Sequence, residues 1–377
     1  WLDPCTYVAG LIGQVNEEEL INVHLSTRFI KVDGFAGSFT SRLQGPEGEF
    51  EIRHGATVVA TGGQEYRGPE YGYGSDPHII TQQEFEQVLD EGGDLPNSVV
   101  MIQCVGPAER YCSRICCTTA LQNALMLKER NPEAQVTVIY RDIRTYGFKE
   151  RIYEEARRAG VMFVHYDFDR KPEVEIGDSG LRVMVQEETL GRRLELDPDL
   201  LVLSMPMVPS EGAQALATRL KTPVDLDGFF LEAHVKLRPV DFATDGFFLA
   251  GTAHYPKFLS ESIAQAQAAA ARAATILSRD TLEVGGIVAQ VDEEACVGCL
   301  TCVRICPYSV PRIRADFTGV GGIVGAAYIE PAQCHGCGIC VGECPARAIQ
   351  LLHYQDGQME AKIAALTDSR VLGGGHG

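Results

Sequence analysis

The sequence predicts an α/β chain with a mostly parallel sheet, followed by a smaller α+β domain. From about residue 97, apolar strands alternate with amphipathic helices, the order typical of parallel sheets. Near the C-terminus, two runs of cysteines share one spacing, and a short segment separates them. The first observation predicts the large α/β part, and the second predicts a separate small domain.

The expected elements follow one another along the chain. Short strands are expected within residues 26–63, and the alternating region then supplies strands and helices in turn. Its strands are expected at 98–105, 135–141, 161–166 and 200–205, its helices at 114–128 and 150–159, and a strand pair through 173–196. A strand at 246–251 and a long helix at 260–278 complete this part, and residues 283–286 mark the boundary to the small domain.

Composition narrows the class of protein. The 377 residues are 45% hydrophobic and 22% charged, with a net charge of −18, which argues against nucleic acid or an anionic membrane surface as partner. No apolar run approaches the roughly 18–20 residues needed to span a bilayer, and no signal peptide is recognisable. The chain starts with Trp1 rather than Met, so we expect an incomplete N-terminus. Thirteen cysteines in such a chain favour metal or redox chemistry in the cytoplasm.

Eight cysteines form a two-cluster ferredoxin pattern. Cys296-x2-Cys299-x2-Cys302-x3-Cys306-Pro recurs as Cys334-x2-Cys337-x2-Cys340-x3-Cys344-Pro, the bacterial run whose fourth cysteine ligates the other cluster. One [4Fe–4S] cluster should therefore bind Cys296, Cys299, Cys302 and Cys344, and the second Cys334, Cys337, Cys340 and Cys306. Paired CxxC motifs also bind zinc, but eight cysteines at this spacing favour iron–sulfur clusters. The glycine-rich residues 319–325 lie between the runs and are expected to be a connecting loop.

A third cysteine group, Cys104, Cys112, Cys116 and Cys117, stands where a dinucleotide-binding unit would carry glycines. Cys104 ends a strand, and the other three are expected in the following helix, with Cys112 and Cys116 on one face. We expect a third [4Fe–4S] cluster here in place of an NAD(P) site. Zinc, or cysteines that are merely core residues, are the alternatives. Cys5 stands alone and receives no role.

Two segments suggest a flavin. Thr57-Val-Val-Ala-Thr-Gly62 resembles a strand-plus-glycine segment of two-dinucleotide-binding flavoproteins, and residues 245–257 resemble the loop beneath their flavin ring. The dipole of the helix that follows would favour negative charge on reduced flavin. Expected flavin contacts are Ala60, Thr61, Gly62, Gly251, Thr252, His254, Pro256, Lys257 and Ser260. Lys257 could equally be a solvated surface lysine. No GxGxxG for the ADP half of FAD is present, so we expect it upstream, on another chain, or lost.

The chain as a whole resembles the A subunit of heterodisulfide reductase. The matching residues are Tyr71-Gly-Tyr-Gly74, Ile102-Gln-Cys-Val-Gly106, Tyr111-Cys-Ser-Arg-Ile-Cys-Cys117, Tyr140-Arg-Asp-Ile-Arg144, Leu237-Arg-Pro-Val240, Phe248-Leu-Ala-Gly251 with Pro256-Lys257, and both ferredoxin runs. The resemblance implies a thioredoxin-reductase-like two-dinucleotide-binding flavoprotein domain with FAD and a cluster on the Cys104 group. The sequence differs from the family in two ways. It lacks the ADP-binding loop, and it has no ferredoxin insertion between Gly37 and Gly62.

The resemblance also implies domains and partners. Residues 1–96 would be part of the FAD-binding domain, 97–240 a Rossmann-like domain with the third cluster, 241–282 a return to the FAD domain, 283–360 the 2[4Fe–4S] ferredoxin domain, and 361–377 a tail. The implied role is an oxidoreductase subunit in flavin-based electron bifurcation. Its partners would be other subunits of the complex, a hydrogenase- or dehydrogenase-linked donor, and ferredoxin. Two alternatives are an electron-relay subunit with a degenerate flavin site and a free-standing NAD(P)H-dependent reductase, which the cysteines at the nucleotide position disfavour.

Overall fold

The computed structural model describes residues 3–178, 180–283 and 285–367, which divide into two units. The first unit comprises the described residues of Trp1–Lys31, Leu43–Gly48 and Ala56–Ala274. The second comprises those of Val32–Arg42, Glu49–Gly55 and Thr275–Gly377. The Cys104 group and the expected flavin segments lie in the first unit, and both ferredoxin runs lie in the second.

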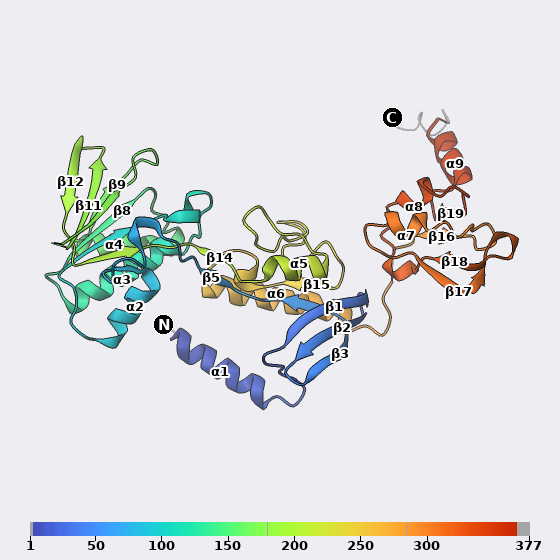
Figure 1. Cartoon of the computed structure of the whole chain (residues 1–377), viewed down its shortest axis with the longest axis horizontal. Helices are drawn as coiled ribbons and strands as arrows, with labels where there is room; N and C mark the ends of the chain where they lie inside the picture. The colour runs from blue at the N-terminus through green and yellow to red at the C-terminus, as the bar shows by residue number, and fades with distance from the viewer. Residues whose placement is uncertain (1–2, 179, 284, 368–377) are drawn as a thin grey trace, which may run out of the picture. The chain divides into compact units, whose positions relative to one another are not determined.

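A five-stranded parallel sheet forms the core of the first unit (Figure 1). Its strand order is β6 (Ile79–Thr81), β13 (Leu200–Leu203), β7 (Ser98–Ile102), β8 (Gln135–Tyr140) and β9 (Met162–His165). The helices α2 (Gln82–Glu91), α3 (Cys116–Arg130) and α4 (Glu150–Arg158) follow β6, β7 and β8 along the chain. Since all five strands run in parallel, their carboxyl ends meet at one edge, where such sheets bind ligands.

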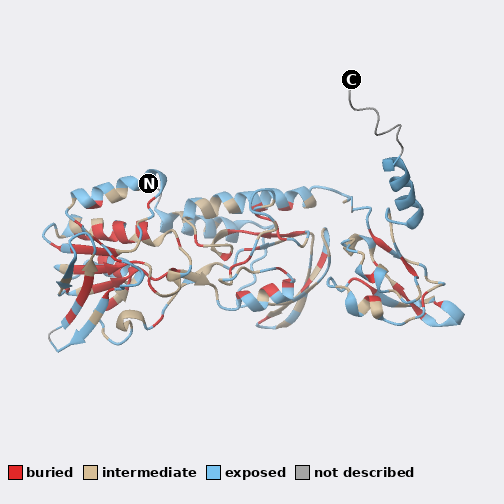
Figure 2. Ribbon diagram, turned by 90° about the horizontal axis from the view of Figure 1, so that it is seen from above, coloured by how far each residue is buried: buried red, intermediate tan, exposed pale blue. Residues whose placement is uncertain are grey.

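Both faces of this sheet are buried, which explains why its strands are continuously apolar. Val99 and Met101 of β7 pack in one cluster with residues of α2, α3 and α4, and Val100 and Ile102 pack in the opposite cluster. Figure 2 shows the resulting concentration of buried residues in the sheet and the helices against it.

The opposite face packs against an antiparallel sheet of β10 (Glu173–Gly177), β11 (Gly180–Glu187) and β12 (Arg192–Leu196), through Leu181, Val183 and Val185. The expected strand pair through 173–196 is therefore wrong by one strand. The chain reverses a second time before Arg192, where Gly191 has φ +62°.

Two short strand pairs complete the sheets of the first unit. β4 (Thr57–Val59) pairs in parallel with β15 (Phe247–Leu249), and β5 (Gly63–Glu65) pairs antiparallel with β14 (Met207–Pro209). Helices α1 (Pro4–Glu17), α5 (Ala213–Leu220) and α6 (Leu259–Leu277) also belong to this unit, apart from the last turn of α6.

β1 (Arg28–Phe35), β2 (Ser38–Gly45) and β3 (Gly48–His54) form a three-stranded sheet in that order.

The C-terminal part of the second unit is a small α+β domain. β16 (Ala289–Val291) pairs with β19 (Ile349–Leu351), and β17 (Arg312–Thr318) with β18 (Val324–Tyr328), both antiparallel. The glycine-rich segment connects β17 to β18, which confirms that it is a loop of a hairpin. Short helices α7 (Thr301–Ile305) and α8 (Ile339–Gly342) each lie within one cysteine run. Helix α9 (Asp356–Thr367) occupies part of the expected tail, and residues 373–377, expected to be disordered, lie outside the described residues.

Within the described residues, no helix combines the length and apolar character needed to cross a membrane.

Candidate functional site

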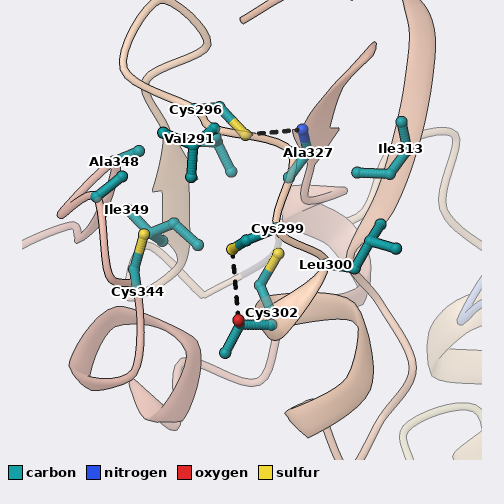
Figure 3. A pocket seen from close by; sticks show the side chains of 14 residues that line it. Val291, Cys296, Cys299, Leu300, Cys302, Ile313, Ala327, Cys344, Ala348 and Ile349 are labelled. Carbon is teal, nitrogen blue, oxygen red and sulfur yellow. Dashed lines mark hydrogen bonds between the residues drawn. The ribbon is translucent and has the colours of Figure 1, made fainter. Parts of the chain in front are cut away.

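One cavity of the C-terminal domain gathers four cysteines from both runs. Cys296, Cys299 and Cys302 come from the first run, and Cys344 comes from the end of the second (Figure 3). The remaining lining is mostly apolar and includes Val291, Leu300, Ile313, Ala327, Ala348 and Ile349. These four cysteines are the set expected for one cluster, brought together although Cys302 and Cys344 lie far apart in sequence.

The other four cysteines of the domain are also close together. Burial, together with the nearby Cys334, Cys306 and Cys337 thiols, raises the pKa of Cys340 to about 11. Cys306 directly follows α7, and Cys344 lies just after α8, so both lie outside these short helices. Pro307 and Pro345 directly follow these two cysteines. Because the residue before a proline disfavours the helical conformation, both helices end before their cysteine.

Backbone amides donate to equivalent sulfurs in the two halves of the domain. The amide of Ala327 lies 3.4 Å from Cys296 Sγ, and that of Ala289 lies 3.3 Å from Cys334 Sγ. The Thr301 hydroxyl, 3.3 Å from Cys299 Sγ, lowers the pKa of Cys299 by its hydrogen bond. Such donors stabilise negative charge on sulfur, and they tune the potential of iron–sulfur clusters.

The Cys104 group lies at the carboxyl edge of the five-stranded sheet. Cys116 Sγ is 3.8 Å from the carbonyl oxygen of Met205, which follows β13. Cys117 Sγ is 3.7 Å from the carbonyl oxygen of Asp142, which follows β8. Cys104 follows β7, the strand between them, with φ +61°.

The expected helical position of Cys112 is wrong. Helix α3 begins only at Cys116, because Arg114 has φ +63°, which interrupts a right-handed helix. Cys112 therefore lies in the loop before the helix, and the amide of Arg114 lies 3.3 Å from its sulfur. The loop returns Cys112 to the group by a turn rather than by helical spacing.

The four thiols of this group lie close enough to affect one another's pKa values. Burial raises the pKa of Cys116, and the nearby Cys117, Cys104 and Cys112 raise it further. Burial likewise raises the pKa of Cys117 to about 11. Thiols this buried stay protonated without a cation, whereas iron binding would replace their protons.

Several side-chain contacts around this group were not predicted from the sequence. Arg114 binds both carboxylate oxygens of Glu261, at 2.6 and 2.7 Å. The Tyr255 hydroxyl donates to the carbonyl oxygen of Cys112 at 3.2 Å, and a hydrogen bond to Asp142 raises the pKa of Arg144. The Arg114 and Tyr255 contacts join residues more than 100 positions apart, which local patterns do not reveal.

The two expected flavin segments lie side by side. The amide of Ala250 donates to the carbonyl oxygen of Val59 at 3.0 Å, which extends the parallel pairing of β15 with β4. Both strands then enter loops with glycine in the left-handed region, Gly62 at φ +75° and Gly251 at φ +70°. A Cβ added at Gly251 would meet nothing within 4 Å. Adjacent glycine loops at the carboxyl ends of parallel strands fit a cradle for a nucleotide cofactor.

Lys257 is half-buried and turned into the protein. Its amino group lies 2.9 Å from both the Gly251 carbonyl oxygen and Gln265 Oε1, and 3.3 Å from His254 Nδ1. Burial lowers the pKa of Lys257 to about 8. The alternative of a solvated surface lysine does not describe this side chain.

His254 links Lys257 to a carboxylate. His254 Nε2 lies 2.8 Å from Glu232 Oε2, and Gln265 Nε2 lies 2.7 Å from His254 Nδ1. Burial lowers the pKa of His254, which favours the neutral ring, with Nε2–H donating to Glu232. Of the remaining expected contacts, Thr252 lies beside Gly62, Pro256 is buried, and Ser260 is exposed in the first turn of α6.

In the described part of the chain, no three His, Cys, Asp or Glu side chains are grouped so that they could hold a single metal ion. A [4Fe–4S] cluster is a different kind of site, because each thiolate binds its own iron atom at a corner of a cube.

Comparisons with known proteins identify the C-terminal domain. Residues 295–348 match the family model described as a 4Fe-4S dicluster domain. Among solved structures, the thioredoxin reductase of T. acidophilum is similar, with 13% identity, a TM-score of 0.45, and coverage of 72% of this chain and 79% of that one. A NAD-dependent persulfide reductase from A. fulgidus gives 15% identity and a TM-score of 0.44, covering 74% of this chain and 49% of that one.

Three similar curated proteins are components of one enzyme type. The A subunit of H(2):CoB-CoM heterodisulfide,ferredoxin reductase from Methanothermobacter marburgensis is 37% identical over 300 residues, covering 74% of this chain and 45% of the relative. The A subunit of ferredoxin:CoB-CoM heterodisulfide reductase from Methanosarcina acetivorans is 34% identical over 373 residues, covering 86% and 45%. The iron-sulfur A subunit of CoB--CoM heterodisulfide reductase from Methanocaldococcus jannaschii is 34% identical over 352 residues, covering 86% and 52%.

The chain spans about half the length of these relatives, and over the part that it spans it belongs to the family of heterodisulfide reductase A subunits.

Proposed function

We propose that this chain is an iron–sulfur flavoprotein subunit of a heterodisulfide-reductase-like oxidoreductase, and that it transfers electrons between FAD and [4Fe–4S] clusters. The observation that carries the proposal is the gathering of twelve cysteines into three groups of four. Two groups lie in the dicluster domain, and the third lies at the carboxyl edge of the parallel sheet.

The proposed ligands follow these groups. Cys296, Cys299, Cys302 and Cys344 would hold one cluster, and Cys334, Cys337, Cys340 and Cys306 the second. The third would be held by Cys104, Cys112, Cys116 and Cys117. Each cluster supplies one-electron transfer, and the amides that point at the cysteine sulfurs would stabilise its charge.

FAD is proposed for the cradle formed by the loops after β4 and β15. Ala60, Thr61, Gly62, Gly251 and Thr252 would line it, with His254, Pro256, Lys257 and Ser260 on the following segment. Bound FAD would supply two-electron chemistry that can be divided into single electrons. The chain's own contribution there is Lys257, which the Gly251 carbonyl, His254 and Gln265 hold in place.

The proposed setting is a cytoplasmic complex of several subunits. The names of the relatives contain the words reductase, heterodisulfide, ferredoxin and H(2). These names support electron bifurcation between a hydrogenase- or dehydrogenase-linked donor, ferredoxin, and a disulfide or other high-potential acceptor. Other subunits would then carry the terminal acceptor. The half-length coverage makes these partners part of the proposal.

The testing experiment is a count of iron, acid-labile sulfide and flavin in anaerobically purified protein. Three clusters require about twelve irons per chain, and two require about eight. Twelve irons with one FAD would support the whole proposal. Eight irons would refute the cluster on the Cys104 group.

A second function remains open to the same experiment. The chain lacks GxGxxG, so a relay subunit with a degenerate flavin site would hold the clusters but no FAD. Protein that contains about twelve irons and no flavin, and that takes up none from added FAD, would favour this relay.

A further inference from the structure

The side-chain amide of Gln103 is fully buried and has no hydrogen-bond partner among the described residues. It is 0% exposed, and neither its Oε1 nor its Nε2 is bonded. Leaving such a group unpaired is costly because it loses its hydrogen bonds to water, so native proteins rarely do so. Two other buried amides of this core are paired: Gln82 Nε2 donates to Ser204 Oγ at 3.2 Å, and Asn123 Nδ2 donates to Gln82 Oε1 at 2.9 Å. The unpaired Gln103 therefore needs an explanation.

The backbone places the Gln103 side chain on the α3 face of the sheet. The backbone N–H of Gln103 donates to the Ile139 carbonyl oxygen at 2.9 Å, which continues the β7–β8 ladder by one residue. Met101 packs with α3, whereas Ile102 packs on the opposite face. Because side chains alternate along a strand, Gln103 points to the same face as Met101.

This position lies at the same carboxyl edge of the sheet as the cysteine group. Cys116 and Cys117 begin α3 and lie beside the carbonyls that follow β13 and β8, and Gln103 follows β7, the strand between those two. Cys104 is the next residue along the chain. Thr118, directly after Cys117, is also buried, at 3% exposed, and its hydroxyl also lacks a partner. Two buried donors without partners, each next in sequence to a cysteine of this group, indicate an acceptor that the polypeptide does not supply.

We propose that the side-chain amide of Gln103 donates an N–H hydrogen bond to the cluster held by the Cys104 group, and thereby raises its reduction potential. The acceptor is a cluster sulfide or a cysteine sulfur, both of which carry negative charge. Reduction adds one more negative charge, so a donor stabilises the reduced cluster more than the oxidised one. The proposal rests on the third cluster of the proposed function, and it assigns a positioning residue that tunes this centre.

The first test is redox titration of the Gln103→Leu variant of the full chain. Its midpoint potential is followed by EPR through the signal that a Cys112→Ser variant lacks. We expect iron content to remain at about twelve per chain and the potential to fall. A tenfold decrease in the equilibrium constant for reduction of the cluster would lower its midpoint potential by about 59 mV for one electron. Gln82→Leu, which removes a buried amide that has protein partners, is the matched control and should leave the potential unchanged.

The second test is made first on the wild-type protein, so its main signal does not depend on the folding of a variant. Protein whose glutamine side chains carry ¹⁵N should show a nitrogen coupling to the reduced cluster in pulsed EPR. In Gln103→Leu, this coupling should vanish. An unchanged potential together with an absent coupling would overturn the role of Gln103. Wild-type protein with about eight irons would instead refute the cluster itself, so the two failures are distinguishable.

Discussion

At the scale of single residues, the cysteine groups coincide with unusual backbone conformations. Cys104 and Arg114 have φ of +61° and +63°, and Leu300, beside Cys299, has φ +64°. Residues other than glycine pay about 1 kcal/mol or more for this left-handed conformation, and such residues concentrate at functional sites. At Cys104 this conformation ends strand β7, and at Arg114 it keeps α3 from starting before Cys116. The loop between them can therefore bring Cys112 back to the group.

Cys112 provides a direct test of the third cluster. Replacing Cys112 with serine removes one thiolate, so we expect iron to fall from about twelve to about eight per chain. The matched control is Cys5→Ser, because Cys5 is exposed on α1 and belongs to no group. The measurement is iron and sulfide analysis of both variants after anaerobic purification. Equal iron content in the two variants would contradict the assignment.

Lys257 should titrate well below an ordinary lysine. Its pKa of about 8, against 10.5 normally, follows from burial. The unfolded chain therefore binds more protons than the folded chain between about pH 8 and pH 10, and this lysine adds stability as the pH rises through that window. Amine acylation followed by peptide mass spectrometry, with exposed Lys236 as reference, should show Lys257 reactivity rising near pH 8. A rise only near pH 10 would be inconsistent with this burial.

At the scale of elements, each proposed ferredoxin cluster would depend on both halves of the domain. The cavity lined by Cys296, Cys299 and Cys302 is completed by Cys344, which lies just after α8. On this assignment, the first run would not supply all four ligands of its own cluster. This exchange ties the α7 segment to the α8 segment in addition to the apolar packing between them.

The exchange predicts which cluster a variant loses. Cys344→Ser and Cys299→Ser should damage the same cluster, whereas Cys337→Ser should damage the other. EPR spectra of the three reduced variants, compared pairwise, measure this. If the Cys344→Ser spectrum matched that of Cys337→Ser, each run would instead hold its own cluster.

Helix α6 depends on small side chains where it packs. Ala269 is 0% exposed, whereas the neighbouring Ala270 is exposed. Ala269→Leu should destabilise the first unit by about 1–3 kcal/mol through overpacking, and Ala270→Leu should change stability little. Urea unfolding of both variants measures this. Equal midpoints would show that α6 does not pack closely at Ala269.

At the scale of the whole molecule, the three cysteine groups differ in exposure. Cys299 and Cys337 are exposed, whereas no cysteine of the Cys104 group is. An exposed ligand gives oxidants and chelators access to the iron. The dicluster domain should therefore be the more vulnerable part of the chain.

This difference predicts two phases of iron loss. Under an anaerobic chelator, about eight irons should leave first and about four later. Absorbance of the iron–chelator complex with time gives the amplitudes, and the Cys112→Ser variant should lack the slow phase. A single phase would indicate equal protection of all three clusters.

The sequence was most informative where pattern and chemistry are local. Four of the five strands of the parallel sheet were predicted within a few residues, because strands buried on both faces are continuously apolar, whereas the short edge strand β6 was not predicted. The helical position of Cys112 was wrong because one residue, Arg114, adopts φ +63° without being glycine. Gln103, Glu232 and the Arg114–Glu261 pair were missed, since their roles arise from partners, or the lack of them, in distant segments. Helices α1, α2, α5 and α9 were not predicted.

The pairing of β4 with β15 has a consequence for biogenesis. About 190 residues separate Val59 from Phe247, so the cradle between them cannot form during translation until the second strand has left the ribosome. The five-stranded sheet, contained within residues 79–203, is complete earlier. At about 5–20 residues per second, several seconds divide the two events. A cofactor bound in this cradle would be loaded late, onto a chain whose sheet and Cys104 group had already been synthesised.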